Sequence, residues 1–387
     1  MTAQDTRVPA DLIRDVLRGL GFDLFTGVPC SYLGDLLALL ARDRPGRYVP
    51  AANEGAALAI ACGATLAHRR SVVLLQNSGL GNLVNPLASL AATFAIPVLL
   101  LVGYRGDPDG PLDEPQHRLM GSATTAILDA LGVRHWRLPD NTGDVPAVLR
   151  LASDEVAAGR TAAVLVAKNT IGPAAGPPPA ADGADGAAID PVAALVALTR
   201  QLSDELVVAT TGYTSRRLFA HGDRPGTFYM QGSMGHAISI GLGLALSRPD
   251  RRVVVVDGDG AALMHLGAMA TVGGHAPANL THLVLDNGRY ESTGGQPTGA
   301  RVAFDAAALA FGYRHAARCR ELADLDGRLA ESLRTAGPAL LHVTVGTSAD
   351  APQRATAAVA PDALRRRFAA DAARPTAALH PVPSARA

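Results

Sequence analysis

Short apolar runs recur along the chain, and residues with helical periodicity follow each of them. The first half contains "FDLFTG", "YVPAANEG", "SVVLLQNSG", "IPVLLLVG", "HWRLP" and "AAVLVA", and the second contains "ELVVATTG", "RRVVVVDGDG", "THLVLDNG" and "ALLHVTVG". Runs of this length with turn residues after them are typical of buried strands. Because strands alternate with helices throughout, each half is expected to form a doubly wound parallel sheet of the α/β class.

The segment "IGPAAGPPPAADGADGAA" separates the two halves. Its Pro, Gly and Ala content does not support a packed element, so residues 171–189 are interpreted as a linker. The domains are then expected at residues 1–170 and 190–371. The last residues, 372–387, show no periodicity and are expected to form a frayed, disordered tail.

Composition narrows the class of protein. The chain has 387 residues, of which 48% are hydrophobic, so two full cores are possible. Thirty-five basic and 35 acidic side chains balance, so no net field favours nucleic acid or a membrane surface. No apolar run predicts a signal core or a membrane span, and a cytoplasmic location is expected. Three scattered cysteines predict reduced thiols and no disulfide framework: Cys30, Cys62 and Cys319.

The loop after the run of four valines carries a carboxylate between glycines, in Gly258-Asp259-Gly260. Glycines at the carboxyl end of a strand let backbone amides approach a phosphate. A carboxylate there would repel the phosphate unless a hard cation such as Mg2+ takes oxygen ligands from both. Asp259 therefore indicates a diphosphate bridged by a metal ion.

Asn287 offers a second oxygen ligand, at the end of the next predicted strand. The 26 residues between Gly260 and Asn287 suit one helix, a turn and a strand. Each turn alone could be a plain Asp-Gly or Asn-Gly turn. Together they resemble the thiamin diphosphate motif, in which Gly-Asp-Gly is followed at about this spacing by a pair ending in Asn. The chain departs from that pattern in having Asp286 as the first member of the pair.

The resemblance extends across most of residues 10–350. "FTGVPCSYL", "NEGAALAIACG", "QNSGLGNLVNPLASL", "DEPQHRLMG", "TTGYTSRRLF", "FYMQGSMGHA" and "ESTGGQPT" resemble the thiamin diphosphate-dependent decarboxylases, and among them the group acting on phosphonopyruvate or sulfopyruvate. This resemblance implies a pyrimidine-binding domain followed by a diphosphate-binding domain, with thiamin diphosphate and Mg2+ as cofactors. It also implies a homodimer or a dimer of dimers with active sites at the subunit interface.

Carried over to this sequence residue by residue, the resemblance implies the following expected roles. Glu54 relays the proton that activates the cofactor, and His117 and Glu291 are further catalytic residues, with Tyr290 another candidate proton carrier. The substrate-binding residues are Cys30, Ser31, Asn77, Ser78, His117 and Arg289. The metal residues are Asp259, Asn287 and Arg289. The cofactor-binding residues are Glu54, Gly212, Tyr213, Thr214, Gly232, Ser233, Met234, Gly258, Asp259, Gly260, Ala261 and Asn287.

The corner "VPCSYL" contains both a thiol and a hydroxyl. Cys30 is not expected to act as a nucleophile, because the cofactor already supplies the carbanion. Ser31, and the amides that follow Pro29, are expected to hold an anion, helped by a cation from Arg105, His117 or Arg289.

The implied reaction is decarboxylation of 3-phosphonopyruvate, an anionic 2-oxo acid, to phosphonoacetaldehyde, in phosphonate or antibiotic biosynthesis. Three alternatives stay open: sulfopyruvate decarboxylation, an acetolactate-type carboligation, and cofactor binding without catalysis. Glu54 argues against the last, because a protein that only binds needs no such carboxylate. Arg289-Tyr290 stand where a small residue and a His are expected, so substrate preference or proton delivery could differ.

Overall fold

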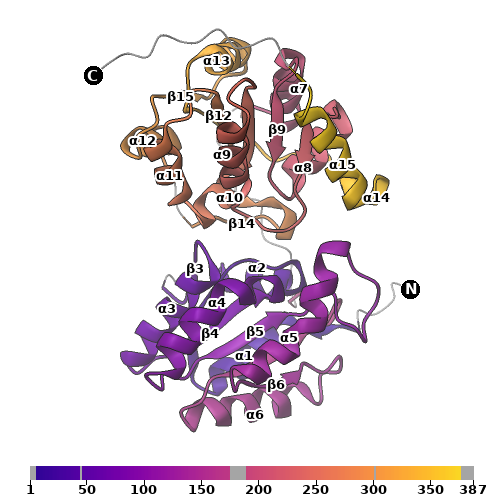
Figure 1. Ribbon diagram of the computed structural model, residues 1–387. Coiled ribbons are helices and arrows are strands. Elements are labelled where there is room, and N and C mark those ends of the chain that lie inside the picture. The colour runs from indigo at the N-terminus through magenta and orange to yellow at the C-terminus, as the bar shows by residue number, and fades with distance from the viewer. Residues whose placement is uncertain (1–5, 44–45, 175–188, 300–301, 376–387) are drawn as a thin grey trace. The chain divides into compact units, whose positions relative to one another are not determined.

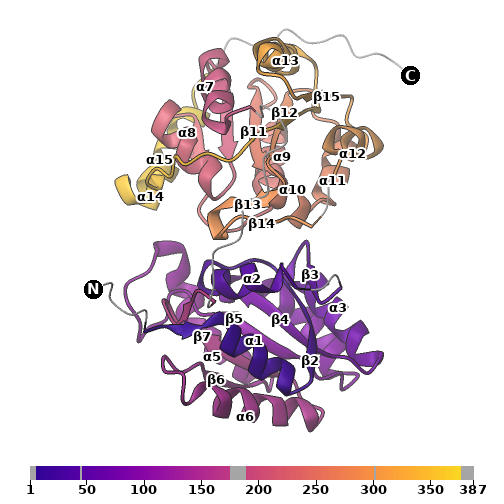
Figure 2. The same cartoon turned by 180° about the vertical axis from the view of Figure 1, so that it is seen from behind.

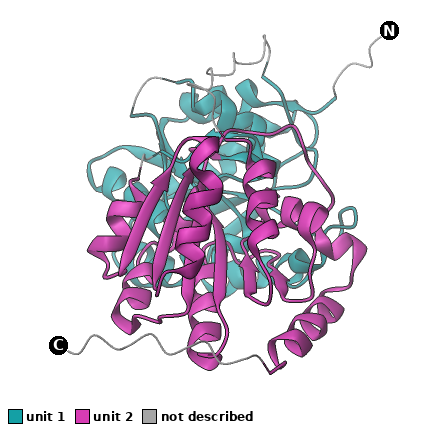
Figure 3. Cartoon of the chain, turned by 90° about the horizontal axis from the view of Figure 1, so that it is seen from above, with its two compact units in different colours: residues 1–180, 290–299 teal, residues 181–289, 300–387 magenta. Residues whose placement is uncertain are grey.

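Two compact units make up the chain. The computed structural model describes residues 6–43, 46–174, 189–299 and 302–375. Unit 1 comprises residues 1–180 and 290–299, and unit 2 comprises residues 181–289 and 300–387, as Figure 3 shows in two colours.

Unit 1 contains a parallel sheet of six strands in the order β3-β2-β4-β5-β7-β6. The strands are β2 (Phe22–Gly27), β3 (Tyr48–Pro50), β4 (Arg70–Gln76), β5 (Leu99–Gly103), β6 (Arg134–Arg137) and β7 (Ala162–Val166). Every residue of β5 is buried, because helices cover both faces of the sheet. A separate short pair joins β1 (Val8–Pro9) to β8 (Ile171–Gly172).

Two helical layers enclose this sheet (Figures 1 and 2). One core cluster packs α1 (Ala10–Gly19), α2 (Gly34–Leu40) and α6 (Val145–Ala157) against the sheet. The other packs α3 (Glu54–Leu66), α4 (Leu80–Pro86), the π-helical η3 (Leu87–Ala92) and α5 (Arg118–Ala130) against it. Asn53 begins α3 by accepting a hydrogen bond from the Ala56 amide at 2.9 Å, which satisfies an amide at the start of that helix. Short 3-10 helices follow strands or loops in residues 1–180 of the unit, at η1 (Ser31–Leu33), η2 (Asn77–Gly79) and η4 (Pro115–His117).

Unit 2 repeats the architecture with the strand order β10-β9-β11-β12-β16-β15. The strands are β9 (Leu206–Ala209), β10 (Thr227–Tyr229), β11 (Val253–Gly258), β12 (Leu280–Asp286), β15 (His315–Cys319) and β16 (Ala339–Thr344). All four valines of β11, Val253 to Val256, are at most 1% exposed. After β12 a two-stranded ribbon joins β13 (Arg289–Tyr290) to β14 (Gln296–Pro297), with η5 (Glu291–Thr293) between them, and its residues from 290 onward belong to unit 1.

The helices of unit 2 also lie on both faces of their sheet. One cluster contains residues of α7 (Pro191–Gln201), α8 (Tyr213–Gly222), α13 (Leu322–Arg334) and α14 (Ala355–Ala358). The other contains residues of α9 (Ala237–Ser247), α10 (Asp259–Met264), α11 (Ala268–His275) and α12 (Phe304–Ala310), and α9 crosses the sheet in Figure 1. The last helix, α15 (Pro361–Ala372), contributes to both clusters.

The structure confirms the predicted fold class, two doubly wound parallel sheets. The predicted linker starts within β8, and its residues 175–188 lie outside the described residues, as do residues 376–387 of the predicted tail. Among the helices that the structure describes, none has the length and apolar character needed to cross a membrane.

Candidate active site

Asp259 and Asn287 follow adjacent strands of unit 2. β11 and β12 pair in parallel, with Gly258 opposite Leu285, so both side chains stand at the carboxyl edge of the sheet. Asp259 begins α10 and is 4% exposed. The Asn287 Oδ1 atom accepts a hydrogen bond from the Arg289 amide at 2.9 Å, which holds the turn in a tight form.

This edge fits a Mg2+ ion and the diphosphate that it would bridge. Asp259 offers a carboxylate and Asn287 an amide oxygen, and hard oxygen donors of this kind are the ligands that Mg2+ prefers. Asp259 and Asn287 are the residues that would hold the ion, and Arg289 in the same turn offers its main-chain carbonyl oxygen but not its cationic side chain. The donor set therefore agrees with the cofactor that the sequence motif implies.

The loops after β9 and β10 reach the same edge of the sheet. Gly212 has a φ of +94°, a conformation that favours glycine, and it precedes the first turn of α8, which carries Tyr213 and Thr214. Amides at the start of a helix of this length suit a phosphate. Gly232 donates its amide proton to the Thr211 hydroxyl at 3.2 Å, and half-buried Met234 follows two residues later. Unit 2 thus brings together the predicted diphosphate, metal and Met234 residues.

In unit 1, Glu54 is the first residue of α3, just after β3, and is 5% exposed. Its Oε2 atom accepts a hydrogen bond from the Asn82 amide at 2.8 Å. A Cβ at position 79 would collide with the Glu54 carboxylate, so a larger residue than Gly79 would displace that carboxylate from its present position. Asn82 and Gly79 both lie in the "QNSGLGN" segment, but nothing in the sequence shows that they fix Glu54.

Arg105, Asp113 and Ser31 form a polar cluster in unit 1. The Arg105 guanidinium donates to Asp113 through Nε and through Nη2, both at 2.7 Å. Its third nitrogen, Nη1, donates to the Ser31 hydroxyl at 3.4 Å. Tyr32 donates to Asp113 at 3.1 Å, and its ring lies 4.8 Å from the Arg105 guanidinium.

Electrostatics keep this pair ionised. Burial works to raise the pKa of Asp113, but hydrogen bonds from Arg105 and from the Glu114 and Gly106 amides outweigh it and hold that pKa well below its usual range. Burial works to lower the pKa of Arg105, and the contact with Asp113 raises it overall. Asp113 and Tyr32 were not predicted as site residues, although Asp113 opens the "DEPQH" motif.

Asn77 is placed under Arg105. It is 0% exposed, its Nδ2 atom donates to the Arg105 carbonyl at 2.8 Å and to Thr124 at 2.9 Å, and its Oδ1 atom accepts the Arg105 amide at 3.1 Å. Because its amide is occupied in this way, Asn77 positions the Arg105 backbone. The exposed neighbour Ser78 accepts a hydrogen bond from Gln76 at 2.5 Å.

His117 lies next to the same loop. A Cβ at Gly106, which has a φ of +66°, would collide with the His117 carbonyl, so the chain after Arg105 and the start of α5 meet through a glycine. His117 is 7% exposed, and its Nε2 atom is 3.9 Å from a Glu114 carboxylate oxygen. The structure therefore gathers Ser31, Arg105 and His117 around one corner of unit 1.

Cys30 lies behind this corner. It is 0% exposed, and burial raises the pKa of its thiol to about 11. A thiol with such a pKa is a poor nucleophile at neutral pH. Cys62 and Cys319 are also free, buried thiols, as the sequence predicts.

Glu291 and Arg289 fall in different units. Residues 290–299 belong to unit 1, although the chain on either side of them belongs to unit 2. Gly299, with a φ of +79°, packs so closely on Pro50 in β3 that a Cβ would lie 2.6 Å from the proline ring. Half-buried Glu291 is thus in the same unit as Glu54, and Arg289 is in the same unit as Asn287.

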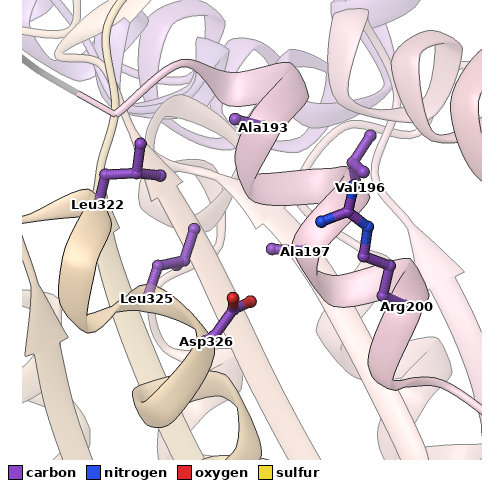
Figure 4. A pocket seen from close by; sticks show the side chains of 7 residues that line it. All are labelled: Ala193, Val196, Ala197, Arg200, Leu322, Leu325 and Asp326. Atoms are coloured by element: carbon purple, nitrogen blue, oxygen red, sulfur yellow. The ribbon is translucent and has the colours of Figure 1, made fainter.

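A pocket between α7 and α13 lies elsewhere in unit 2 (Figure 4). Its lining includes Val196, Arg200, Leu325 and Asp326. None of the predicted site residues lines it, so we do not assign the cofactor or the substrate to this pocket.

Comparisons with known proteins identify the family of the chain. The family model "Thiamine pyrophosphate enzyme, N-terminal TPP binding domain" matches residues 8–127, and "Thiamine pyrophosphate enzyme, C-terminal TPP binding domain" matches residues 210–343. These two matches fall in the first and second halves of the chain, in the order that the motifs predict.

Three curated relatives are similar over most of their length. A phosphonopyruvate decarboxylase from Streptomyces viridochromogenes is 42% identical over 95% of this chain and 96% of its own. One from Streptomyces hygroscopicus is 42% identical over 85% of both chains. A sulfopyruvate decarboxylase from Methanosarcina acetivorans is 31% identical over 75% of this chain and 78% of its own. The resemblance inferred from the motifs is confirmed, and the chain belongs to the thiamine pyrophosphate enzymes, in the family of the phosphonopyruvate decarboxylases.

Proposed function

We propose that this protein is a carboxy-lyase that converts 3-phosphonopyruvate and a proton to phosphonoacetaldehyde and CO2, in the cytoplasm and in the service of phosphonate biosynthesis. The observation that carries the proposal is the 42% identity to a phosphonopyruvate decarboxylase across 95% of the chain. The oxygen donors at Asp259 and Asn287 support the cofactor requirement.

When bound, thiamin diphosphate supplies a nucleophilic carbon and takes up the electrons released as CO2 leaves. Glu54 would hold the proton that this activation needs, at the aminopyrimidine nitrogen. The Asn82 side chain orients the Glu54 carboxylate through a hydrogen bond from Nδ2 to Oε2 at 2.8 Å. His117, Tyr290 and Glu291 are the candidates for the later proton transfers to the substrate. Asp259 and Asn287 would hold the metal ion through their side-chain oxygens, and Arg289 could contribute only its main-chain carbonyl oxygen.

Ser31 and Arg105 hold the phosphonate head group. The Arg105 guanidinium contacts both Asp113 and, at 3.3 Å, Glu114, so the cluster has no net positive charge and is proposed to recognise an anion through directed donors. The Arg105 Nη1 atom and the Ser31 hydroxyl face one another at 3.4 Å, and both can donate to a tetrahedral oxyanion placed beside them. Pyruvate has a methyl group in place of that oxyanion.

A second candidate function is sulfopyruvate decarboxylation. It is supported by the 31% identity to a sulfopyruvate decarboxylase over 75% of the chain. A sulfonate is also tetrahedral and could accept the same hydrogen bonds, but it carries one negative charge where a phosphonate carries up to two. The two substrates therefore have to be compared directly.

The active assembly is proposed to be a homodimer or a dimer of dimers, with each active site at a subunit interface. Light scattering on the active enzyme should give at least twice the mass of the 39.8 kDa chain. A fully active monomer would overturn the shared site.

Phosphorus NMR tests the reaction itself. The chain, supplied with thiamin diphosphate and Mg2+, should convert 3-phosphonopyruvate to phosphonoacetaldehyde with one CO2 released per aldehyde. Unchanged phosphonopyruvate in the presence of bound cofactor would overturn the proposal.

A further inference from the structure

A buried histidine lies directly behind the turn that carries Asn287. His342 is in β16, between β12 and β15, and is 2% exposed. Its Nε2 atom is 2.8 Å from the Asp286 Oδ2 atom, and its Nδ1 atom is 3.4 Å from the Asp305 Oδ1 atom. Each ring nitrogen therefore faces a carboxylate oxygen.

The Asp305 carboxylate is held in place by a second contact. Arg318 lies opposite His342 on β15 and donates to the Asp305 Oδ1 atom at 2.6 Å. Burial works to raise the pKa of Asp305, but hydrogen bonds from Arg318 and His342 outweigh it and lower that pKa. The Phe304 ring meets the His342 ring edge to face, with centroids 5.3 Å apart, which restricts how the imidazole can turn.

The Asp286 carboxylate contacts the turn that carries Asn287. The Asp286 Oδ1 atom accepts the Gly288 amide at 3.0 Å, while the Asn287 Oδ1 atom accepts the Arg289 amide at 2.9 Å. Asp286 thus uses one oxygen on the turn and the other on His342. The hydrogen bonds connect Arg318, through Asp305, His342 and Asp286, to the backbone that presents Asn287.

We propose that His342 is a positioning residue for the Mg2+–diphosphate site, acting through Asp286 on the turn that carries Asn287. The inference rests on the proposed function, because it takes Asn287 as a metal ligand. It also explains why an aspartate is tolerated as the first member of the Asp286-Asn287 pair: the carboxylate has a dedicated buried partner. Residues that orient metal ligands typically change metal affinity by about 10- to 100-fold when they are replaced.

Two amide substitutions distinguish the contact made by Nε2 of His342 from the contact made by Nδ1. His342→Gln places an N–H near the former Nε2 position and keeps the contact with Asp286. His342→Asn is shorter and keeps a polar atom near the former Nδ1 position, facing Asp305, while losing Asp286. Both variants leave a polar amide at the same buried position, so they form a matched pair.

Isothermal titration calorimetry with thiamin diphosphate and Mg2+ makes the test. His342→Asn should bind the cofactor about 10- to 100-fold more weakly than the parent, and His342→Gln within roughly threefold of it. At saturating cofactor, kcat of both variants should stay close to the parental value, since only the holding of the ion has changed. Parental affinity in both variants, or equal weakening in both, would overturn the inference.

Three further variants secure the comparison. Thr281→Val removes one buried hydrogen bond from the start of β12, the 3.2 Å contact with the Ser332 carbonyl, and should lower the melting temperature without changing cofactor affinity. Asp259→Ala sets the scale of complete loss of binding. If a His342 variant does not fold, Asp305→Ala repeats the test at a side chain that is 28% exposed, where several-fold weaker binding is expected and parental affinity would overturn the inference. A parent chain that binds no thiamin diphosphate would instead overturn the proposed function.

Discussion

Arg105 and Asp113 form a two-point ion pair, with the guanidinium Nε and Nη2 atoms each 2.7 Å from a carboxylate oxygen. Both side chains are largely buried, at 12% and 6% exposure. This two-point contact fixes the plane of the guanidinium, and the remaining Nη1 atom then lies toward Ser31. Asp113 therefore determines where Arg105 can present a donor to a substrate.

Arg105→Lys should lose most of this arrangement although it keeps the charge. A lysine ammonium cannot form the two-point contact with Asp113 and also face Ser31. The KM for phosphonopyruvate should rise at least several-fold, while thiamin diphosphate affinity stays unchanged. Steady-state kinetics and calorimetry on the same preparation check both statements. A parental KM in the lysine variant would show that the two-point contact between Arg105 and Asp113 does not contribute to binding of the phosphonate group.

Ser31→Ala should weaken phosphonopyruvate turnover by about 1 to 3 kcal/mol of transition-state binding, or roughly 5- to 150-fold in kcat/KM, if one charge-assisted hydrogen bond is lost. The matched comparison is the slow turnover of pyruvate, which has no head group. Equal losses toward both substrates would mean that Ser31 serves the common chemistry.

Glu54→Gln should keep the fold and much of the cofactor affinity. The glutamine still meets Asn82 and fits against Gly79 but cannot relay a proton. Turnover should fall by about 10²- to 10⁴-fold, the usual worth of a general acid or base. Rapid-quench measurement of CO2 release checks this, and a variant with near-parental rate would refute the role of Glu54.

Cys30→Ala should retain substantial activity. Burial raises the pKa of the Cys30 thiol to about 11, so at pH 8 only about one thiol in a thousand is ionised. Iodoacetamide at that pH should label Cys30 slowly in the folded protein, as peptide mass spectrometry can follow, and labelling should accelerate as the pH approaches 11. Loss of activity in the alanine variant, with normal folding and cofactor binding, would give the thiol a role in the reaction.

All six strands of the unit 1 sheet, its edge strands β3 and β6 included, and the four interior strands of the unit 2 sheet could be predicted from sequence. The two edge strands of unit 2, β10 and β15, could not. The four consecutive valines of β11 predict a strand that is covered on both faces, and the structure has such a strand there. β15 has the sequence "HAARC" at the edge of its sheet, and most of its residues are partly exposed, so it lacks the apolar signal. The edge strand β10, "TFY", is mostly buried, but its three residues are too few to give a recognisable apolar run.

Residues of the candidate site could be proposed from sequence where their spacing is typical of a known motif, and not where contacts join distant loops. Asp259 and Asn287 could be proposed as metal ligands because their spacing suits the ends of two neighbouring strands. Asn77 stays a predicted substrate contact, but the sequence does not show that its side-chain amide binds the Arg105 backbone, because the two residues lie in separate loops, after β4 and after β5. The contact between His342 and Asp286 could not be predicted from sequence, because His342 lies within an apolar strand more than fifty residues from Asp286.

The central claim is tested most directly by measuring kcat/KM for 3-phosphonopyruvate, sulfopyruvate and pyruvate side by side, on one preparation supplied with thiamin diphosphate and Mg2+. The account predicts that phosphonopyruvate is turned over best, that sulfopyruvate follows, and that pyruvate is poor and gives no coupled product. Preference for sulfopyruvate, or formation of acetolactate from pyruvate alone, would contradict it.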